Sequence, residues 1–191
     1  MPIDGTRIDQ WNERYRAGEQ VFETPAPLVV EFVRALAPGI ALDLASGPGR
    51  NSLYLAERGW RVTAVDGSPV GIDLLLAGAR ERKLSIDVRV ADLEAGELAI
   101  PPEAFDLLLS CYYLQRSLIP LMKSALRPGG LLILIAHLAD ADQRQGTPTR
   151  AYPDELRALF SDWAILHYRE GEPGESGHRH AVVELVAKKP G

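Results

Sequence analysis

The sequence has one cysteine, Cys111, among its 191 residues. A single cysteine cannot form an intramolecular disulfide and cannot by itself supply a structural zinc site. No uninterrupted apolar run approaches the length of a membrane-spanning helix, and residues 1–10 lack the charged and then apolar pattern of a secretory signal. We therefore expect a cytoplasmic protein with no membrane partner.

Basic residues are also in the minority. The 21 Lys and Arg side chains stand against 26 Asp and Glu, for a formal net charge of −5. The basic residues are scattered through the chain, so there is no stripe of the kind that binds nucleic acid. The four histidines lack the spacing of metal ligands, and no metal site is predicted. These features favour a small-molecule partner; they leave the oligomeric state open.

Length and hydrophobic content predict a single domain over residues 1–191. With 46% hydrophobic residues the chain can form one core, with helices on both faces of a sheet. The clearest local pattern lies in residues 40–66. An apolar strand over Ile40–Leu44 is followed by a turn of small residues, Ala45–Gly49, then a helix and a second strand that ends at Asp66.

This strand, turn and helix predict a nucleoside site. Glycines let a ligand approach the backbone closely, and the amino end of a helix attracts a carboxylate or phosphate. Asn51 or Ser52 is expected to cap that helix. Asp66 stands 19 residues after Gly47, where an acid commonly accepts hydrogen bonds from ribose hydroxyls.

The turn does not fit a dinucleotide fingerprint well. A fingerprint that begins at Gly47 would have Ser52 in place of its last glycine or alanine. A nicotinamide-dependent oxidoreductase is therefore the second interpretation of this unit.

Residues 43–49, DLASGPG, resemble the first motif of class I S-adenosylmethionine-dependent methyltransferases, an acid followed by small-x-Gly-x-Gly. Ala45 replaces the usual first glycine. Because alanine disfavours positive backbone angles, we expect this turn to be slightly reshaped. Further matches follow in order: VRVADL at 88–93, FDLLLS at 105–110 and LRPGG before LLILIAHL at 126–138.

The resemblance implies an α/β three-layer sandwich, in which a seven-stranded, mostly parallel sheet has an antiparallel last strand. The carboxyl-terminal sequence agrees, because apolar segments at 163–168 and 180–187 flank a polar loop and predict a hairpin. An oxidoreductase fold would continue with helix-linked parallel strands instead.

The resemblance also implies a cofactor, S-adenosyl-L-methionine, with S-adenosyl-L-homocysteine as product. Asp92 would meet the adenine amino group, and the backbone at 110–111 would face the cofactor's charged end. The expected cofactor-binding residues are Trp11, Tyr15, Asp43, Ala45, Gly47, Gly49, Asn51, Asp66, Gly67, Ser68, Asp92, Leu93, Ser110 and Cys111.

Residues 9–25, DQWNERYRAGEQVFETP, resemble the amino-terminal segment of small tellurite-resistance and thiopurine-type methyltransferases. The resemblance implies that residues 1–39 form a helical segment of the domain that covers the cofactor. Trp11 and Tyr15, four residues apart, would share one face of a helix and pack against the cofactor. The alternative is an amphipathic helix whose aromatic side chains belong to the core.

Of the expected reaction, the sequence determines the methyl acceptor least. A thiolate, selenolate or reduced tellurium anion needs no base, whereas an oxygen or ammonium acceptor needs one, and His137 is the best-placed candidate. Tyr113 is expected to bind the acceptor and Arg116 to hold an anionic one. We weigh a small-molecule methyltransferase, with a chalcogen acceptor preferred, against a non-enzymatic S-adenosylmethionine-binding protein and the oxidoreductase.

Overall fold

The computed structural model describes residues 6–19, 21–96, 98–139, 148–175, 177–178 and 180–191. The chain divides into two compact units, Met1–Ala99 and Ile100–Gly191, and each unit is described by itself below. A single domain over residues 1–191 stays a prediction.

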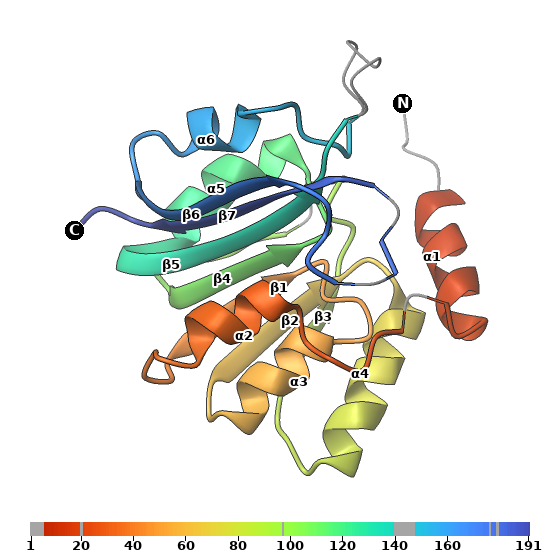
Figure 1. The fold of residues 1–191 in the computed structure, drawn as a ribbon. Helices are drawn as coiled ribbons and strands as arrows, with labels where there is room; N and C mark the ends of the chain where they lie inside the picture. The colour runs from red at the N-terminus through yellow and green to blue at the C-terminus, as the bar shows by residue number, and fades with distance from the viewer. Residues whose placement is uncertain (1–5, 20, 97, 140–147, 176, 179) are drawn as a thin grey trace. The chain divides into compact units, whose positions relative to one another are not determined.

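Seven strands form one sheet in the order β3-β2-β1-β4-β5-β7-β6 (Figure 1). β1 pairs with β2, β2 with β3 and β4 with β5 in parallel, whereas β7 runs antiparallel to both β5 and β6. The predicted α/β fold with an antiparallel last strand is confirmed. The strands are β1 (Ile40–Leu44), β2 (Arg61–Asp66), β3 (Asp87–Val90), β4 (Phe105–Cys111), β5 (Leu126–His137), β6 (Ala164–Gly171) and β7 (Val182–Lys188).

The first unit combines β1, β2 and β3 with four helices. These are α1 (Thr6–Arg16), α2 (Pro27–Val33), α3 (Arg50–Glu57) and α4 (Pro69–Glu81). α3 packs on β1 and β2, α4 packs on β2 and β3, and the two helices contact each other (Figure 1). Ala41, Leu42 and Leu44 of β1 are completely buried. Burial of consecutive residues is what the apolar run predicted for a parallel strand covered on both faces.

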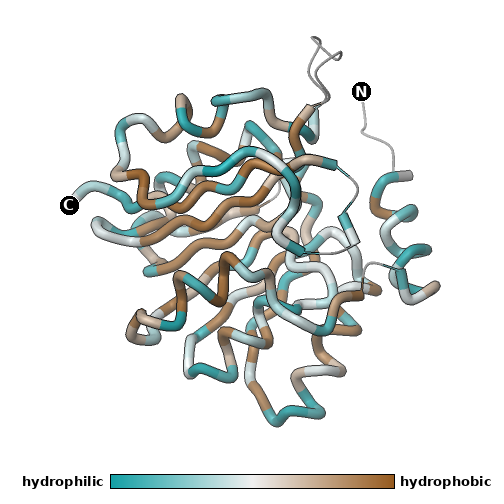
Figure 2. Tube along the Cα trace, in the orientation of Figure 1, coloured by the Kyte–Doolittle hydropathy of each residue, from teal (hydrophilic) through white to brown (hydrophobic). Residues whose placement is uncertain are grey.

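The second unit contains β4, β5, β6 and β7 with a 3₁₀ turn, η1 (Arg116–Leu118), and the helices α5 (Ile119–Ala125) and α6 (Glu155–Leu159). α5 packs on β5, and α6 packs on β7. Residues 182–187 of β7 are all buried, and Figure 2 shows hydrophobic residues along β5 and β7. The exception within β7 is Glu184, a charged residue that is only 7% exposed.

Two elements differ from the sequence prediction. β3 ends at Val90, two residues before the expected acid, Asp92. β3 is one of the two edge strands of the sheet and Val90 is 56% exposed, so hydrophobic burial does not extend the strand further. Before the carboxyl-terminal hairpin the sequence predicts a helix that begins near Tyr152, whereas α6 begins at Glu155.

None of the helices in the described part of the chain combines the length and the apolarity that crossing a membrane requires.

Candidate functional site

The turn after β1 holds three residues with positive φ: Ala45 at 55°, Gly47 at 53° and Gly49 at 84°. The expectation that Ala45 would avoid such an angle is wrong, and the slight reshaping of the turn stays a prediction. Hydrogen bonds next to Ala45 fix the backbone: Ser46 N donates to Val65 O at 3.1 Å, and Gly47 N donates to Asp66 Oδ2 at 2.7 Å. These bonds hold the alanine in a conformation that costs a non-glycine residue about 1–2 kcal/mol.

The two glycines of this turn are required by packing as well. A Cβ atom on Gly49 would lie 2.3 Å from Leu75 Cγ, and one on Gly47 would lie 2.7 Å from the hydroxyl oxygen of Tyr15. Leu75 is a fully buried residue of α4. The turn is therefore closely packed against α4 on one side and against α1 on the other.

Asp66, at the end of β2, fastens the turn to the start of α4. Its Oδ2 accepts the amide of Gly47 and its Oδ1 accepts the amide of Ser68, each at 2.7 Å. The side chain is buried, which raises its pKa, while the two amides act in the opposite direction. A carboxylate has about four acceptor positions, so two remain for the ribose hydroxyls that the sequence predicted as its partners.

Asp43, in β1, is even more deeply buried than Asp66. Its Oδ2 accepts a 2.6 Å hydrogen bond from the hydroxyl of Ser52, and burial raises its pKa to about 7. The nearby Asp66 carboxylate raises that pKa further, while the Ser52 hydrogen bond and Arg50 lower it. Near neutral pH this side chain therefore exists in both protonation states.

The prediction that Asn51 or Ser52 caps α3 is wrong. The residue at the cap position is Gly49, and no side chain there accepts a hydrogen bond from the helix. Ser52 donates to Asp43, whereas Asn51 Oδ1 accepts the amide of Ala26 at 2.9 Å. Both side chains are buried and point to partners outside the helix, so they fix the position of α3 instead of its end.

Ser46 is a turn residue that sequence reasoning passed over. Its hydroxyl oxygen is buried and has no hydrogen-bond partner among the described residues. A hydroxyl between the small residues of a ligand-binding turn was the available signal. A buried hydroxyl of this kind fits a polar ligand that contacts the turn.

Helix α1 lies against the turn and the start of α4. Ser68 Oγ donates to Asn12 Oδ1 at 2.6 Å and accepts the amide of Gly71 at 3.0 Å, which makes Ser68 the cap of α4. A Cβ atom on Gly67 would lie 3.2 Å from Ile8 Cδ1. Two predicted cofactor-binding residues, Gly67 and Ser68, are thus in contact with α1. Asn12, buried at 7% exposure, was not predicted.

Trp11 and Tyr15 share a face of α1, as their spacing predicted. Their rings stack with centroids 5.5 Å apart, and the guanidinium of Arg14 lies 5.0 Å from the centroid of Trp11. Burial, followed by the charge of Asp66, raises the pKa of the Tyr15 hydroxyl, which is therefore neutral at physiological pH. That these rings cover a cofactor stays a prediction.

Asp92 and Leu93 begin the loop after β3. Asp92 Oδ1 accepts the amides of Glu94 at 2.8 Å and Ala95 at 3.3 Å, and Leu93 is buried. Glu94 forms an ion pair with Arg7 of α1. The carboxylate of Asp92 thus shapes the loop that α1 touches, and its contact with adenine stays a prediction.

In the second unit, β4 ends with two of the predicted residues, Ser110 and Cys111. Ser110 is completely buried and its hydroxyl donates to Tyr113 O at 3.1 Å. The next residue, Tyr112, has a φ of 61°, and its amide donates to Ile135 O at 2.7 Å. Tyr112 is held in a strained conformation at this strand end, and binding of the acceptor by its neighbour Tyr113 stays a prediction.

The side chain of Arg116 is extensively bonded within the second unit. Its guanidinium donates to both carboxylate oxygens of Glu155, at 2.6 and 2.8 Å, and to the carbonyl oxygens of Pro148 and Arg150, at 3.1 and 3.0 Å. The Glu155 carboxylate raises the pKa of Arg116. These contacts hold the segment 148–155 in place, and the predicted role of Arg116 as a ligand for an anion stays untested by them.

His137, at the end of β5, belongs to a group of four rings that we name the ring cluster: Tyr112, His137, His178 and His180. Tyr112 and His178 stack with centroids 3.6 Å apart and an interplanar angle of 4°. The centroid of His137 lies 5.6 Å from that of Tyr112, 5.5 Å from that of His178 and 5.9 Å from that of His180. Burial, together with His178, His180 and Arg150, lowers the pKa of His137 to about 4.

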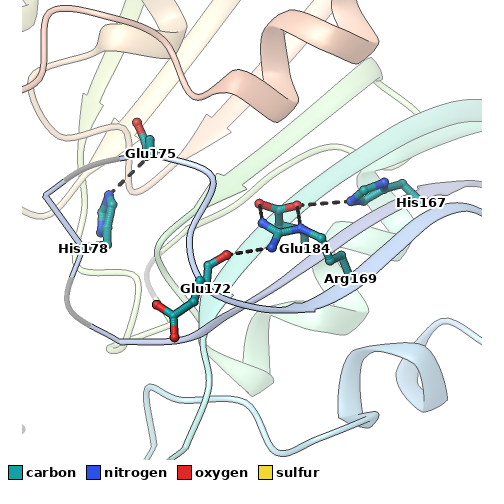
Figure 3. Close-up of polar contacts among 6 residues, drawn as sticks. All are labelled: His167, Arg169, Glu172, Glu175, His178 and Glu184. Atoms are coloured by element: carbon teal, nitrogen blue, oxygen red, sulfur yellow. Dashed lines mark hydrogen bonds and ion pairs between the residues drawn. The ribbon is translucent and has the colours of Figure 1, made fainter.

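Charged residues of β6 and β7 lie near the loop that carries two of these rings (Figure 3). Arg169 donates to both oxygens of Glu184, at 2.6 and 3.0 Å, and to Glu172 O at 2.7 Å. His167 Nε2 lies 3.2 Å from the same carboxylate. The buried charge of Glu184 is thereby paired. The bond from Arg169 to Glu172 O fixes the first residue of the loop against β6.

The chain is similar to several known bacterial proteins. Hemagglutinin 1 of Eikenella corrodens is 31% identical over 181 residues, covering 84% of this chain and 58% of that protein. The probable S-adenosyl-L-methionine-dependent methyltransferase TehB of Haemophilus influenzae is 30% identical over 178 residues, covering 84% and 61%. Trans-aconitate 2-methyltransferase of Paracidovorax citrulli is 37% identical over 135 residues, covering 66% and 50%. The chain therefore spans 50–61% of the length of these three relatives.

The fold has close counterparts among solved structures. The crystal structure of TehB from Haemophilus influenzae matches with a TM-score of 0.76 and 25% identity, covering 93% of this chain and 67% of that one. The family model described as Tellurite resistance protein TehB matches residues 10–182. The glycine turn, the strands β1 to β6 and most of the amino-terminal helix fall inside that range. This chain belongs to the TehB family of class I methyltransferases.

Proposed function

We propose that this chain is a methyltransferase that uses S-adenosyl-L-methionine, releases S-adenosyl-L-homocysteine and acts on a small molecule. The observation that carries the proposal is the closed glycine turn of the first unit. There Asp66 fixes the amide of Gly47, Ser46 presents a buried hydroxyl, and α1 packs on the turn through Tyr15. Membership of the TehB family and the relative in Haemophilus influenzae support the same activity.

The residues of the turn fit the cofactor's chemical groups. When bound, S-adenosyl-L-methionine supplies a methyl group on a positively charged sulfur, which is open to in-line attack by a nucleophile. Asp66 retains acceptor positions for ribose hydroxyls. Asp43, with a pKa of about 7, ionises more readily beside a cationic ammonium group. Asp92, at the loop after β3, would accept from the adenine amino group.

Helix α1 would exclude water from the cofactor. Its contacts with Gly67, Ser68 and Gly47 place one face of the helix on the residues that the sequence assigned to the cofactor. Excluding water strengthens electrostatic interactions and prevents side reactions. Removing residues 1–20 tests this role. The truncated protein should bind the cofactor more weakly and turn over more slowly, and unchanged values would show that α1 is only part of the core.

For the acceptor we propose a small anion, with a soft chalcogen anion as the first candidate. The tellurite resistance family supports it, and such a nucleophile arrives deprotonated, so the chain needs no general base. A carboxylate is the second candidate, because one relative is a trans-aconitate methyltransferase and trans-aconitate is a tricarboxylate. An anionic small molecule also agrees with the expectation from the sequence of a cytoplasmic protein that does not bind nucleic acid.

Isothermal titration with S-adenosyl-L-methionine and S-adenosyl-L-homocysteine tests the cofactor, with NAD(H) and NADP(H) as controls. We expect micromolar binding of the sulfur-containing pair alone. Binding of a nicotinamide cofactor, or of none of the four, would overturn the proposal. Turnover is then measured with thiols, selenite, tellurite and trans-aconitate. Cofactor binding without methyl transfer to any of them would favour a protein that binds S-adenosyl-L-methionine without catalysis.

A further inference from the structure

The ring cluster brings three of the four histidines of the chain together from two separate segments. His137 is the last residue of β5, whereas His178 and His180 lie in the loop between β6 and β7. Within the described parts of the chain, no three His, Cys, Asp or Glu side chains are arranged to hold a metal ion.

Arg150 and His180 form one side of the cluster. The Nε2 of His180 lies 3.0 Å from a guanidinium nitrogen of Arg150. Guanidinium nitrogens only donate, so Nε2 is the acceptor in this contact. Arg150 therefore places a permanent positive charge beside the histidine rings.

His137 carries a ring nitrogen that the rest of the described chain does not use. Its Nδ1 is buried and has no hydrogen-bond partner among the described residues. The polar and charged groups around the ring come from three other segments: Tyr112 after β4, Arg150 before α6, and Glu175, His178 and His180 in the loop. Glu175 Oε1 lies 3.6 Å from His178 Nε2, so this carboxylate of the loop faces His178. Arg169 of β6 adds a positive charge near Tyr112.

Building on the proposed function, we propose that the ring cluster binds the methyl acceptor as an anion and that His137 takes up a proton from solvent when the acceptor binds. The imidazolium formed in this way donates from Nδ1 to the anion. Arg150 supplies a permanent positive charge on the other side. No electron is transferred, and the proton returns to solvent when the ligand leaves.

The direction of the pH dependence follows from the pKa of His137 before the anion binds. His137 has a pKa of about 4 because it is buried beside positive charge. A bound anion favours the charged form and raises that pKa. At a pH between the pKa of His137 in the free protein and its pKa in the anion-bound protein, binding takes up about one proton. The affinity for the anion should therefore rise about tenfold for each unit that the pH falls in this range. Below a pH of about 4 the gain ends, because His137 is already protonated before binding.

The test measures proton uptake and not activity. Protein saturated with S-adenosyl-L-homocysteine is titrated with trans-aconitate and with sulfate, both largely ionised between about pH 6 and pH 7.5. Each titration is repeated in Bis-Tris and in imidazole buffer, which are not anions and whose ionisation enthalpies differ, so the difference in observed heat gives the number of protons bound. We expect uptake approaching one proton and tighter binding at pH 6 than at pH 7.5.

Two histidine variants distinguish proton uptake by the ring cluster from an effect of pH on the rest of the protein. His137→Gln should abolish the proton uptake and flatten the pH dependence. His167→Gln replaces the histidine outside the cluster, which contacts Glu184, and should retain both. If His137→Gln does not fold, the ring protons of the wild-type histidines are followed by NMR, where the lowest-titrating histidine should shift to higher pH when trans-aconitate is added.

Three results would overturn the proposal: anion binding without proton uptake, uptake that His137→Gln leaves unchanged, and no binding of either anion at pH 6. Failure of the proposed function is seen separately, because it appears as the absence of S-adenosyl-L-homocysteine binding in the saturation step. In that case the anion titration is carried out on the protein alone, and its proton count still decides the role of His137.

Discussion

The amide of Gly47 donates to the carboxylate of Asp66 over 2.7 Å, although 19 residues separate them. This bond connects the turn after β1 to the end of β2. The other oxygen of the same carboxylate accepts the amide of Ser68, where α4 begins. One buried side chain thus fixes the turn and the amino end of a helix at the same time, and both contribute residues to the expected cofactor site.

Asp66→Ala should weaken cofactor binding by roughly ten- to 150-fold, or about 1.5–3 kcal/mol, since charge-assisted hydrogen bonds to ribose and the support of the turn are both lost. Titration with S-adenosyl-L-homocysteine measures the change. Asp73→Asn, an exposed aspartate of α4, is the control and should bind like the wild type. An affinity within error of the wild type for Asp66→Ala would exclude Asp66 from the site.

Asp43 should make stability depend on pH. Burial raises its pKa from 3.8 in the unfolded chain to about 7 in the folded protein, so the folded state holds this proton more tightly. The contribution of Asp43 to stability is therefore greatest below a pH of about 4 and falls as the pH rises towards 7, by up to about 1.4 kcal/mol per unit. Asp43→Asn cannot titrate and should lack this loss.

Urea unfolding of the wild type and of Asp43→Asn at pH 5, 6, 7 and 8 measures this effect. The free energy of unfolding of the variant should gain on that of the wild type up to about pH 7 and then stay level. Asp73→Asn serves again as the control. A constant difference between Asp43→Asn and the wild type across this range would mean that Asp43 does not titrate there.

The hydrogen bond between Ser68 and Asn12 should couple α1 to α4. Ser68→Ala should cost about 1 kcal/mol from the lost cap of α4 alone. In a double-mutant cycle with Asn12→Ala, the coupling energy should be about 0.5–1.5 kcal/mol. Ser85→Ala, an exposed serine of the same unit, should be additive with Asn12→Ala. Additivity of the Ser68 and Asn12 variants would mean that the 2.6 Å contact contributes nothing to stability.

Opposite substitutions in the turn should have opposite effects. Ala45→Gly relieves the strain of a φ of 55° and should leave stability unchanged or raise it by up to about 1 kcal/mol. Gly49→Ala places a Cβ atom 2.3 Å from Leu75 Cγ at a φ of 84° and should lower stability by more than about 2 kcal/mol. Thermal unfolding compares the two; a similar loss in both would mean that the positive angle of Ala45 causes no strain.

Much of the first unit was predictable from the sequence because the relevant interactions are local. The run Ile40–Leu44, the small residues after it and the acid at Asp66 specify a strand, a turn and a second strand by burial and backbone freedom alone. The ring pair of Trp11 and Tyr15 follows from helical spacing. These features need no knowledge of distant contacts.

The partners of polar side chains could not be predicted in this way. Asn51 was expected to cap α3, but its acceptor oxygen is used by Ala26, 25 residues earlier. The guanidinium of Arg116 donates to Glu155, 39 residues later, and nothing in the sequence around Arg116 indicates this partner. The ring cluster joins the end of β5 to a distant loop between β6 and β7. Such choices depend on which segments the sheet brings together, and spacing along the chain does not contain that information.

The hydrogen bond from Ser52 to Asp43 closes residues 43–52 into a ring that spans the strand end, the turn and the first residues of α3. A ring of fixed size tolerates exchange of side chains but not a change in the number of residues. Adding or removing one residue would turn Ser52 by about 100° around α3 and away from Asp43. Family members that keep both polar residues should therefore keep the same spacing between them, so insertions that diversify function must be sought in other loops.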